Sequence, residues 1–401
     1  MGTNGKRQGL VALMFVLSVM SYLDRTAMSI AAPSIIREFA ISETAMGTVF
    51  SAFLLGYTAF MTPAGAWADR VGARLALVVS GLGTALFTGL TAVSSAVPVF
   101  LGVRLAMGVF TAPLYPACGR VVSNWVAVGR RAQTQAFILS GSAIGAAIAP
   151  PAIAAIIAGF GWRAAFAAAA AATTLFTLVW YIVGRDHPSG VAARASAPVT
   201  AKVAWKHLAR NRNLLLLTTG YFFLNYFEYI FLYWIYYYFG EIRHMGATES
   251  AYYVTALFVT MAIMMPLGGW TSDRLIYRLG RRRGARIVPI VGVTLSSVLL
   301  FAGAHSAAGP VVTISLLALA LGFCATAEGP YWGSAMLVGK DNAGAACGIL
   351  NAGGNLGGMV APVVTPMVAA RFGWAAGLYV ASALVLVAVV VWFWISLESD
   401  D

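Results

Sequence analysis

The stretch GAWADRVGAR, residues 65–74, decides the fold, because a related stretch, GWTSDRLIYRLGRRR, recurs at residues 269–283. Each follows the second long apolar run of one half of the chain and holds an Asp-Arg pair ahead of further arginines. Self-similarity of this kind is the mark of an internally duplicated chain. The sequence therefore predicts two related halves, although the second copy of the motif departs from the first by a longer insertion before Gly280.

Two further repeats support the duplication, and both have an interval of 212 residues. SGSAIGAAIAP at residues 140–150 aligns with AGGNLGGMVAP at residues 352–362, and the Gly-Trp pair that begins at Gly161 recurs at Gly373. Glycines four residues apart leave a groove in which the backbone of a partner helix can approach closely. The longer repeat predicts such grooves at Gly141, Gly145, Gly353 and Gly357.

The composition excludes a soluble globular protein. Of 401 residues, 60% are hydrophobic and 10% are charged, and the mean hydropathy is +0.80, values typical of a polytopic membrane protein. Apolar runs of about 20 residues predict an all-α membrane protein with 12 transmembrane helices in two pseudo-symmetric six-helix halves. We expect the helices near residues 9–35, 44–67, 75–94, 98–122, 132–158, 163–184, 213–239, 250–271, 287–305, 310–335, 345–369 and 374–396.

The positive charges predict the orientation, because Lys and Arg are retained on the cytoplasmic side of short loops. With both termini cytoplasmic, only four of the 26 Lys and Arg lie outside and two lie within helices. We predict halves at residues 1–184 and 213–401, joined by a basic cytoplasmic linker at 185–212. The protein is expected in the cell inner membrane, as a monomer. The net charge of +12 then reflects topology, and no nucleic-acid partner is predicted.

Neither targeting nor cofactor chemistry is indicated. The first apolar run continues past Asp24 to Pro33, which is longer than the core of a cleaved signal peptide. The three cysteines fall in predicted helices without CxxC spacing, so no disulfide framework and no metal site are expected. No nucleophile and base are spaced for catalysis, and we predict no enzyme activity and no cofactor.

Ionisable side chains within the predicted helices are the candidates for function. Each costs a few kcal/mol near the bilayer centre, so several together indicate a polar internal cavity. They are Asp24, Arg25, Arg104, Glu228 and Glu328.

Helical geometry separates the adjacent residues Asp24 and Arg25. Arg25 shares a face with Ser18, Tyr22 and Ser29, whereas Asp24 points about 100° away. Arg25 would present a planar, permanently charged fork that suits a carboxylate or a sulfonate. Asp24, turned toward neighbouring helices, can pair with an arginine or take up a proton, and a purely structural ion pair is the alternative.

The other helices add polar candidates at helical spacing. Arg104 begins a stripe that continues through Gly108, Thr111 and Tyr115 and would be a second cavity arginine. Most aromatic residues of the 213–239 helix are expected in its core or interface. Its two polar side chains that need a partner are Asn225 and Glu228.

Two asparagines of the helix at 345–369 lie on one face. Asn351 and Asn355 are four residues apart, which suits hydrogen bonds to substrate hydroxyls, with interhelical hydrogen bonds as the alternative. Glu328 lies beside Cys324, Tyr331 and Trp332 in the sequence of the preceding helix.

The Gly-x-x-x-Asp-Arg-x-Gly-x-Arg pattern and the two halves together resemble the major facilitator superfamily of secondary transporters, over the whole chain. The resemblance implies that this loop and its repeat act as a conformational latch, in which Asp69 and Arg70 contact neighbouring helix ends. A solvated turn placed by its positive charge is the alternative. The latch residues implied are Gly65, Asp69, Arg70, Gly72, Arg74, Asp273 and Arg274.

Four motifs narrow the resemblance to the anion:cation symporter family, which includes bacterial sugar-acid permeases and vesicular glutamate transporters. They are YLDR, RLAMG with APLYP, GWRAAF and NAGGNLGG. The resemblance implies that Arg25 and Arg104 bind an anionic substrate, that Tyr22 and Asn351 help to hold it, and that Asp24 takes part in proton coupling.

One position departs from this family pattern. Many members carry a glutamate seven residues after the arginine of the fourth helix, where this chain has Thr111. Glu228 and Glu328 are candidates to replace its role in proton coupling, and coupling through Asp24 alone is the alternative that the sequence leaves open.

The sequence thus predicts a secondary transporter that imports a small organic anion (a carboxylate, a sugar acid or a sulfonate) together with protons. Proton-driven efflux of drugs or metabolites is the alternative, favoured by the aromatic helix at 213–239. Against it, the fifth helix ends in GAAIAPP, whereas drug antiporters usually have a Gly-Pro-x-x-Gly-Gly ending. Sodium coupling also remains open.

Overall fold

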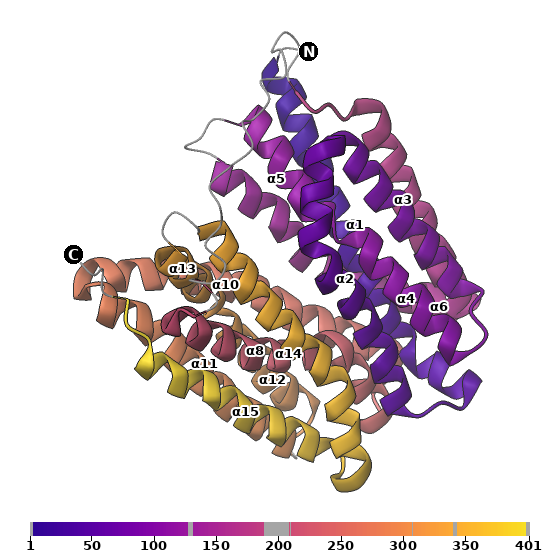
Figure 1. The fold of residues 1–401 in the computed structure, drawn as a ribbon. Helices are drawn as coiled ribbons and strands as arrows, with labels where there is room; N and C mark the ends of the chain where they lie inside the picture. The colour runs from indigo at the N-terminus through magenta and orange to yellow at the C-terminus, as the bar shows by residue number, and fades with distance from the viewer. Residues whose placement is uncertain are drawn as a thin grey trace. The chain divides into compact units, whose positions relative to one another are not determined.

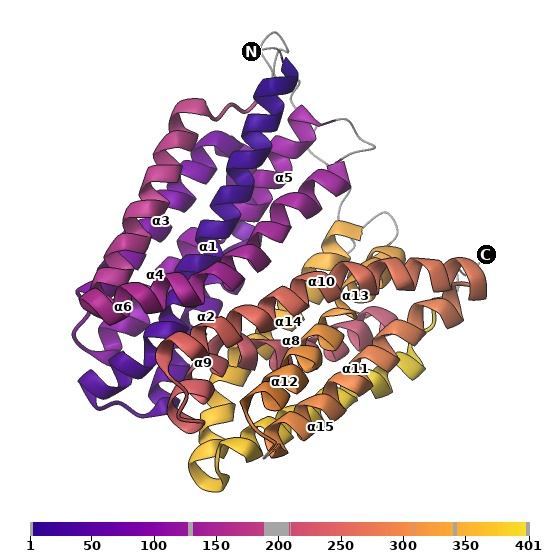
Figure 2. The same cartoon turned by 180° about the vertical axis from the view of Figure 1, so that it is seen from behind.

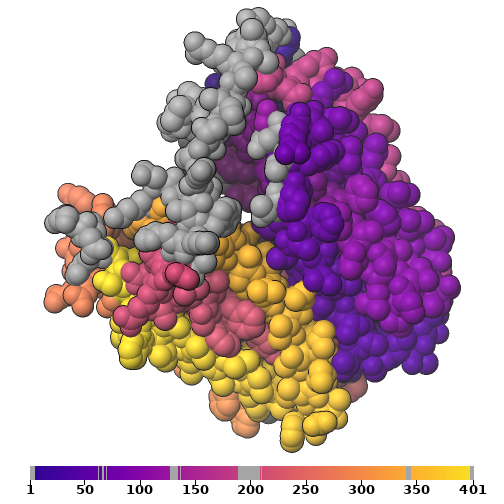
Figure 3. All heavy atoms as spheres, in the orientation of Figure 1, coloured from indigo at the N-terminus to yellow at the C-terminus, as the bar shows by residue number. Residues whose placement is uncertain are grey.

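The computed structural model describes residues 3–126, 131–187, 208, 210–306, 308–339 and 343–397. Within these residues the chain is helical and has no strand. The predicted linker at 185–212 lies for the most part outside the described residues. In Figures 1 and 2 the helices of the first half of the chain, indigo to magenta, run side by side, and so do the later helices, orange to yellow. Figure 3 shows the heavy atoms in the same orientation as Figure 1.

The helices form two compact units. The N-terminal unit is Met1–Thr200 with Gly246–Tyr252, and the C-terminal unit is Ala201–Met245 with Tyr253–Asp401. The helices of the first part of the chain are α1 (Thr3–Phe39), α2 (Glu43–Val71), α3 (Ala73–Ala92), α4 (Val97–Thr111), α5 (Leu114–Trp125) and α6 (Arg131–Val183). The later helices are α8 (Arg212–Tyr233), α9 (Ile235–Tyr237), the π-helical turn η2 (Tyr238–Ile242), α10 (Ala247–Leu279), α11 (Arg281–His305), α12 (Pro310–Ala325), α13 (Glu328–Gly339), α14 (Ala343–Phe372) and α15 (Trp374–Trp394).

The number of membrane-crossing helices agrees with the predicted twelve. Among the described residues, 11 helical stretches are long and apolar enough to cross a membrane. One of them, Phe137–Val183, has 47 residues, far more than the roughly 20 that a bilayer needs. Its backbone leaves the helical region at Gly161, with φ 79° and ψ 167°, so this stretch supplies two of the twelve spans.

Both fourth helices are broken, which the apolar pattern did not predict. The expected helix at 98–122 is divided into α4 and α5 by a turn at Ala112, and the one at 310–335 is divided into α12 and α13 at Thr326. A proline ring clashes with the carbonyl four residues earlier in a helix. Pro116 and Pro330 lie four residues after these two positions, which explains why both halves break at corresponding places.

Glycines with positive φ begin the third and sixth helices of both halves. Gly72 (φ 91°) precedes α3, Gly280 (φ 80°) precedes α11 and Gly373 (φ 83°) precedes α15, as Gly161 does inside α6. This backbone conformation strains any residue with a Cβ. The glycines of the repeated motifs therefore allow the chain to change direction between consecutive spans.

The predicted glycine grooves are confirmed within each unit. A Cβ on Gly141 of α6 would lie 2.6 Å from the carbonyl oxygen of Phe15 in α1, and one on Gly145 would meet the carbonyl oxygen of Val19. In α14, Gly357 lies in the same way against the carbonyl oxygen of Phe222 in α8. The glycines thus let the backbones of these helix pairs come into contact.

Candidate functional site

The buried arginine of α1 is held among aromatic rings. The guanidinium carbon of Arg25 lies 4.5 Å from the ring centroid of Phe53, 4.8 Å from that of Tyr22 and 5.2 Å from that of Tyr57. Cation–π attraction is worth about 2 kcal/mol or more where the charge is desolvated. We call these three rings, Tyr22, Phe53 and Tyr57, the Arg25 cage. Because only 4% of Arg25 is exposed, the cage is how α1 and α2 accommodate the buried charge.

Asp24 points in a different direction from Arg25, as helical geometry predicted. Its Oδ2 accepts a hydrogen bond of 2.7 Å from the hydroxyl of Thr173 in α6. Its Oδ1 has no hydrogen-bond partner among the described residues, and the side chain is fully buried. An electrostatic interaction with Arg104 offsets the charge of this carboxyl group.

Arg104 of α4 interacts with two adjacent residues of α1, Asp24 and Arg25. Its Nη2 donates to the carbonyl oxygen of Arg25 at 3.4 Å, and its Nη1 contacts the sulfur of Met107 at 3.1 Å. The side chain is 1% exposed. Arg104 therefore interacts with both the carboxyl group of Asp24 and the backbone of Arg25, contacts that the sequence pattern did not reveal.

The predicted stripe of the fourth helix is divided among three partners. Gly108 packs against the backbone of α2 at Tyr57, and the hydroxyl of Thr111 lies 2.9 Å from that of Thr84 in α3. The hydroxyl of Tyr115 lies 3.0 Å from that of Ser18 in α1. The predicted stripe continues through Arg104, Gly108 and Thr111 in α4 but not to Tyr115, which lies in α5 beyond the turn at Ala112.

Thr111 occupies a neutral seam. Its hydroxyl also donates to the carbonyl of Met107 at 2.8 Å, and Thr88 of α3 lies against the Met107 sulfur. The hydroxyl groups satisfy one another without a charge. Thr111 therefore forms a helix–helix contact between α4 and α3. It lies at the position where the family resemblance implied a carboxylate in many members.

In the C-terminal unit, Glu328 organises a second polar cluster at the break between α12 and α13. Its Oε2 accepts hydrogen bonds from the Tyr221 hydroxyl at 2.8 Å and from the Trp332 indole N–H at 3.2 Å. The same indole N–H lies 3.0 Å from the Tyr221 hydroxyl. Glu228 of α8 is buried and interacts electrostatically with Glu328. It also forms a hydrogen bond with the side chain of Cys324. The structure thus brings together two glutamates that lie far apart in the sequence.

The three candidate asparagines bond largely along their own helices. Asn225 donates to the carbonyl of Tyr221 at 3.1 Å, and Asn355 donates to the carbonyl of Asn351 at 3.0 Å. Tyr229 of α8 donates to the side-chain oxygen of Asn355 at 3.4 Å. This last contact is interhelical, and it is the alternative role foreseen for these residues.

The first copy of the predicted latch motif, residues 65–74, is joined through Arg74 to the end of α6 and the residues that follow it. The backbone N–H of Arg74 donates to Asp186 at 2.9 Å, and the indole N–H of Trp180 donates to the Arg74 carbonyl at 3.2 Å. A Cβ on Gly72 would lie 3.1 Å from the carboxylate of Asp186. Sequence reasoning missed Asp186 and Trp180, because both lie more than 100 residues from the motif.

The remaining latch residues have fewer described contacts. Arg70 is exposed, and Gly65 faces Pro116 at van der Waals distance. Asp69 lies in α2, but its side chain is outside what the structure describes. In α10, Asp273 is exposed and Arg274 lies over the ring of Trp270 on its own helix.

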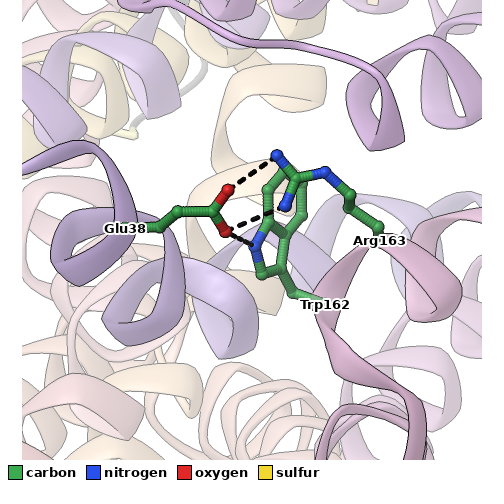
Figure 4. Close-up of polar contacts among 3 residues, drawn as sticks. All are labelled: Glu38, Trp162 and Arg163. Carbon is green, nitrogen blue, oxygen red and sulfur yellow. Dashed lines mark hydrogen bonds and ion pairs between the residues drawn. The ribbon is translucent and has the colours of Figure 1, made fainter.

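A clamp at the other end of α1 explains the GWRAAF motif (Figure 4). Oε2 of Glu38 accepts hydrogen bonds from the indole N–H of Trp162 at 2.7 Å and from Nη1 of Arg163 at 2.9 Å. Nη2 of Arg163 lies 2.7 Å from the other carboxylate oxygen. Gly161 turns the backbone so that both side chains reach one acid. The acidic residue in the last turn of α1 was the signal that sequence reasoning overlooked.

The corresponding Gly-Trp pair of the second half makes an aromatic contact instead. The ring of Trp374 lies 5.3 Å from that of Trp234 and 5.5 Å from that of Tyr237. In both halves the tryptophan at the start of the sixth helix therefore packs on the first helix of its half or on its continuation.

Twelve spans in two units with buried charge clusters define a multi-pass membrane protein with a transporter fold. The chain matches the model of the Major Facilitator Superfamily over residues 14–336 and belongs to this superfamily. It is accordingly a membrane transporter and not an enzyme.

Named relatives and solved structures agree with this assignment. The chain is 27% identical to the hexuronate transporter of Bacillus subtilis over 378 residues, covering 92% of this chain and 89% of that protein. It is 28% identical to the D-galactonate transporter of Escherichia coli over 409 residues, covering 96% and 94%. A crystal structure of a bacterial homologue of the human lysosomal transporter Spinster has a TM-score of 0.85 at 16% identity, covering 97% of both chains. This last likeness shows the fold.

Proposed function

We propose that this chain is a proton-coupled importer of a small organic anion, such as a sugar acid, with Arg25 as the principal anion-binding group. The Arg25 cage is the observation that carries the proposal. The named relatives, which are a hexuronate transporter and a D-galactonate transporter, support the substrate class. Lys and Arg positions support an inner-membrane location with both termini cytoplasmic.

The cage suits anion binding because of how a guanidinium group uses its two surfaces. Its flat faces stack on aromatic rings, whereas its N–H groups point outward in the plane and bind carboxylates through paired hydrogen bonds. Tyr22, Phe53 and Tyr57 contact the cation through their rings. The cage can therefore fix the orientation of Arg25 without competing with a carboxylate for its in-plane donors.

Asp24 and Arg104 supply the coupling step of this proposal. With Asp24 ionised, the carboxylate attracts Arg104, which also donates to the carbonyl of Arg25. A proton on Asp24 cancels that attraction and raises the positive potential around Arg25, which favours an anion. Loss of the proton to the cytoplasm weakens anion binding. Coupling requires only this difference in affinity between the two states.

The test is uptake of labelled anions into proteoliposomes. We expect glucuronate or galactonate to accumulate when the outside is acidic and a protonophore to abolish the accumulation. Uncharged xylose is the control solute. Accumulation driven by a sodium gradient without a proton gradient would contradict proton coupling.

Three variants assign the roles. Arg25→Ala and Arg104→Ala are expected to abolish uptake, and Asp24→Asn is expected to keep anion exchange and lose gradient-driven accumulation. Arg371→Ala removes an exposed arginine at the end of α14 and serves as the matched control, with uptake unchanged. Full proton-driven accumulation by Asp24→Asn would refute the coupling scheme.

A further inference from the structure

Two carboxyl groups of the C-terminal unit, the buried Glu228 and the partly buried Glu328, have no part in the coupling step described above. Glu228 comes from the middle of α8, and Glu328 comes from the first turn of α13. They interact electrostatically with each other. Packing of α8 against α13 brings them together, although two spans, α10 and α11, separate them in the chain.

The two glutamates differ in the hydrogen bonds that their carboxyl groups accept. Glu328 accepts two hydrogen bonds at one oxygen, from Tyr221 and Trp332, and donors of this kind stabilise an ionised carboxylate. Glu228 is 9% exposed, and its Oε1 has no hydrogen-bond partner among the described residues. A carboxylate buried in that way is costly unless it is neutral or paired.

The helices packed against α8 provide no cation near the pair, and α11, which packs against α13, carries its arginines in its first two turns and His305 at its last residue. Helix α8 packs against α12, α13, α14 and α15, and between their terminal turns these five helices contain no Lys, Arg or His. The titratable neighbours are Tyr221, Tyr229, Cys324 and Tyr331, whose side chains are uncharged at neutral pH. Two negative charges in such surroundings would repel strongly.

We propose that Glu228 and Glu328 together form a second proton-binding site, which holds one proton between them and is separate from Asp24. The proton lies mainly on Glu228, and Tyr221 and Trp332 are positioning residues that hold Glu328 as the ionised partner. Resting on the proposed function, this site carries a second coupled proton in each transport cycle. It supplies the carboxylate chemistry that Thr111 does not.

Infrared difference spectroscopy of the purified, ligand-free protein tests the site directly. A pH titration should reveal a protonated-carboxyl band, beyond that of Asp24, that is lost in Glu228→Gln. The band should be retained in Glu249→Gln, a control that removes an exposed acid at the start of α10. Persistence of the full band in the Glu228→Gln, Glu328→Gln double variant would overturn the proposal.

A milder variant keeps the test valid if loss of an acid prevents folding. Tyr221→Phe keeps both glutamates and removes the hydroxyl that donates to Glu328 at 2.8 Å. The carboxyl band should shift in frequency in this variant, because the shared proton redistributes between the acids. A band identical to that of the wild type would contradict the assignment of Tyr221 and of the pair.

Transport measurements test whether the proton is carried. Each coupled proton contributes about a tenfold accumulation ratio for each pH unit of gradient. Glu228→Gln should therefore accumulate the anion about tenfold less per pH unit than the wild type, with exchange preserved, and wild-type accumulation would refute transport of this proton.

The two proposals fail in different ways. The infrared band needs no substrate, so its absence overturns the glutamate site and leaves anion uptake untouched. Absence of anion uptake, with the band present and lost in Glu228→Gln, overturns the proposed function and leaves the proton site in place.

Discussion

A methyl group at Gly141 should destabilise the N-terminal unit, and the neighbouring atoms indicate by how much. In Gly141→Ala the new Cβ would lie 2.6 Å from the carbonyl oxygen of Phe15 and 3.0 Å from the Cβ of Ser18. The nearer atom belongs to the backbone of α1 and cannot rotate away. Accommodating the methyl group therefore requires α1 and α6 to separate.

Gly102 of α4 provides the matched control. A Cβ on Gly102 would have no atom within 4 Å other than those of adjacent residues and of the backbone of its own helix. Like Gly141, Gly102 lies in the interior of its helix. Both substitutions gain the same helix propensity, up to about 1 kcal/mol. The difference between them is the cost of overpacking, about 1–3 kcal/mol.

The assay is unfolding in mixed detergent micelles, followed by circular dichroism, with initial uptake rates measured in parallel. Gly141→Ala should have a free energy of unfolding about 1–3 kcal/mol below that of Gly102→Ala. Equal free energies for the two variants would refute the close approach of α1 to α6.

Three further substitutions test single contacts. Thr173→Val should lower the free energy of unfolding by about 1–3 kcal/mol, because it leaves the buried carboxyl of Asp24 without its donor; Thr173→Ser should restore most of the loss, and a fully stable Val variant would contradict the contact. Trp162→Phe removes one hydrogen bond to the exposed Glu38 and should lower the free energy of unfolding in the same assay without lowering uptake. Arg25→Lys keeps the charge but loses paired in-plane donors, so anion affinity in a thermal-shift titration should fall about 10- to 100-fold, in line with about 1.5–3 kcal/mol for a charged hydrogen bond; unchanged affinity would argue against Arg25 as the anion-binding group.

Several features could be read directly from the sequence because their causes are local. The different directions of Asp24 and Arg25 follow from the rotation of about 100° per helical residue. The glycine grooves follow from a spacing of four. The breaks at Ala112 and Thr326 also have a local cause, the prolines four residues later, but the apolar pattern concealed them.

Other features of the candidate site had no local signal. Nothing in the sequence around Arg104 indicates that it faces Asp24 and the carbonyl of Arg25. The same holds for Glu228 and Glu328, which only the packing of α8 against α13 brings together. The roles assigned to these side chains in transport remain predictions.

The sequence by itself determined a membrane transporter fold of twelve helices in two repeated halves, since hydrophobic length and internal repetition act along the chain. The tertiary structure decided which charges meet. The hydrogen bond between Asp24 and Thr173 spans 149 residues, and its formation depends on the rotation of α1 and α6 about their axes. Gly141 and Gly145 fit the backbone of α1 before the break at Gly161, and Thr173 reaches Asp24 from the span after it, an arrangement that no single helix encodes.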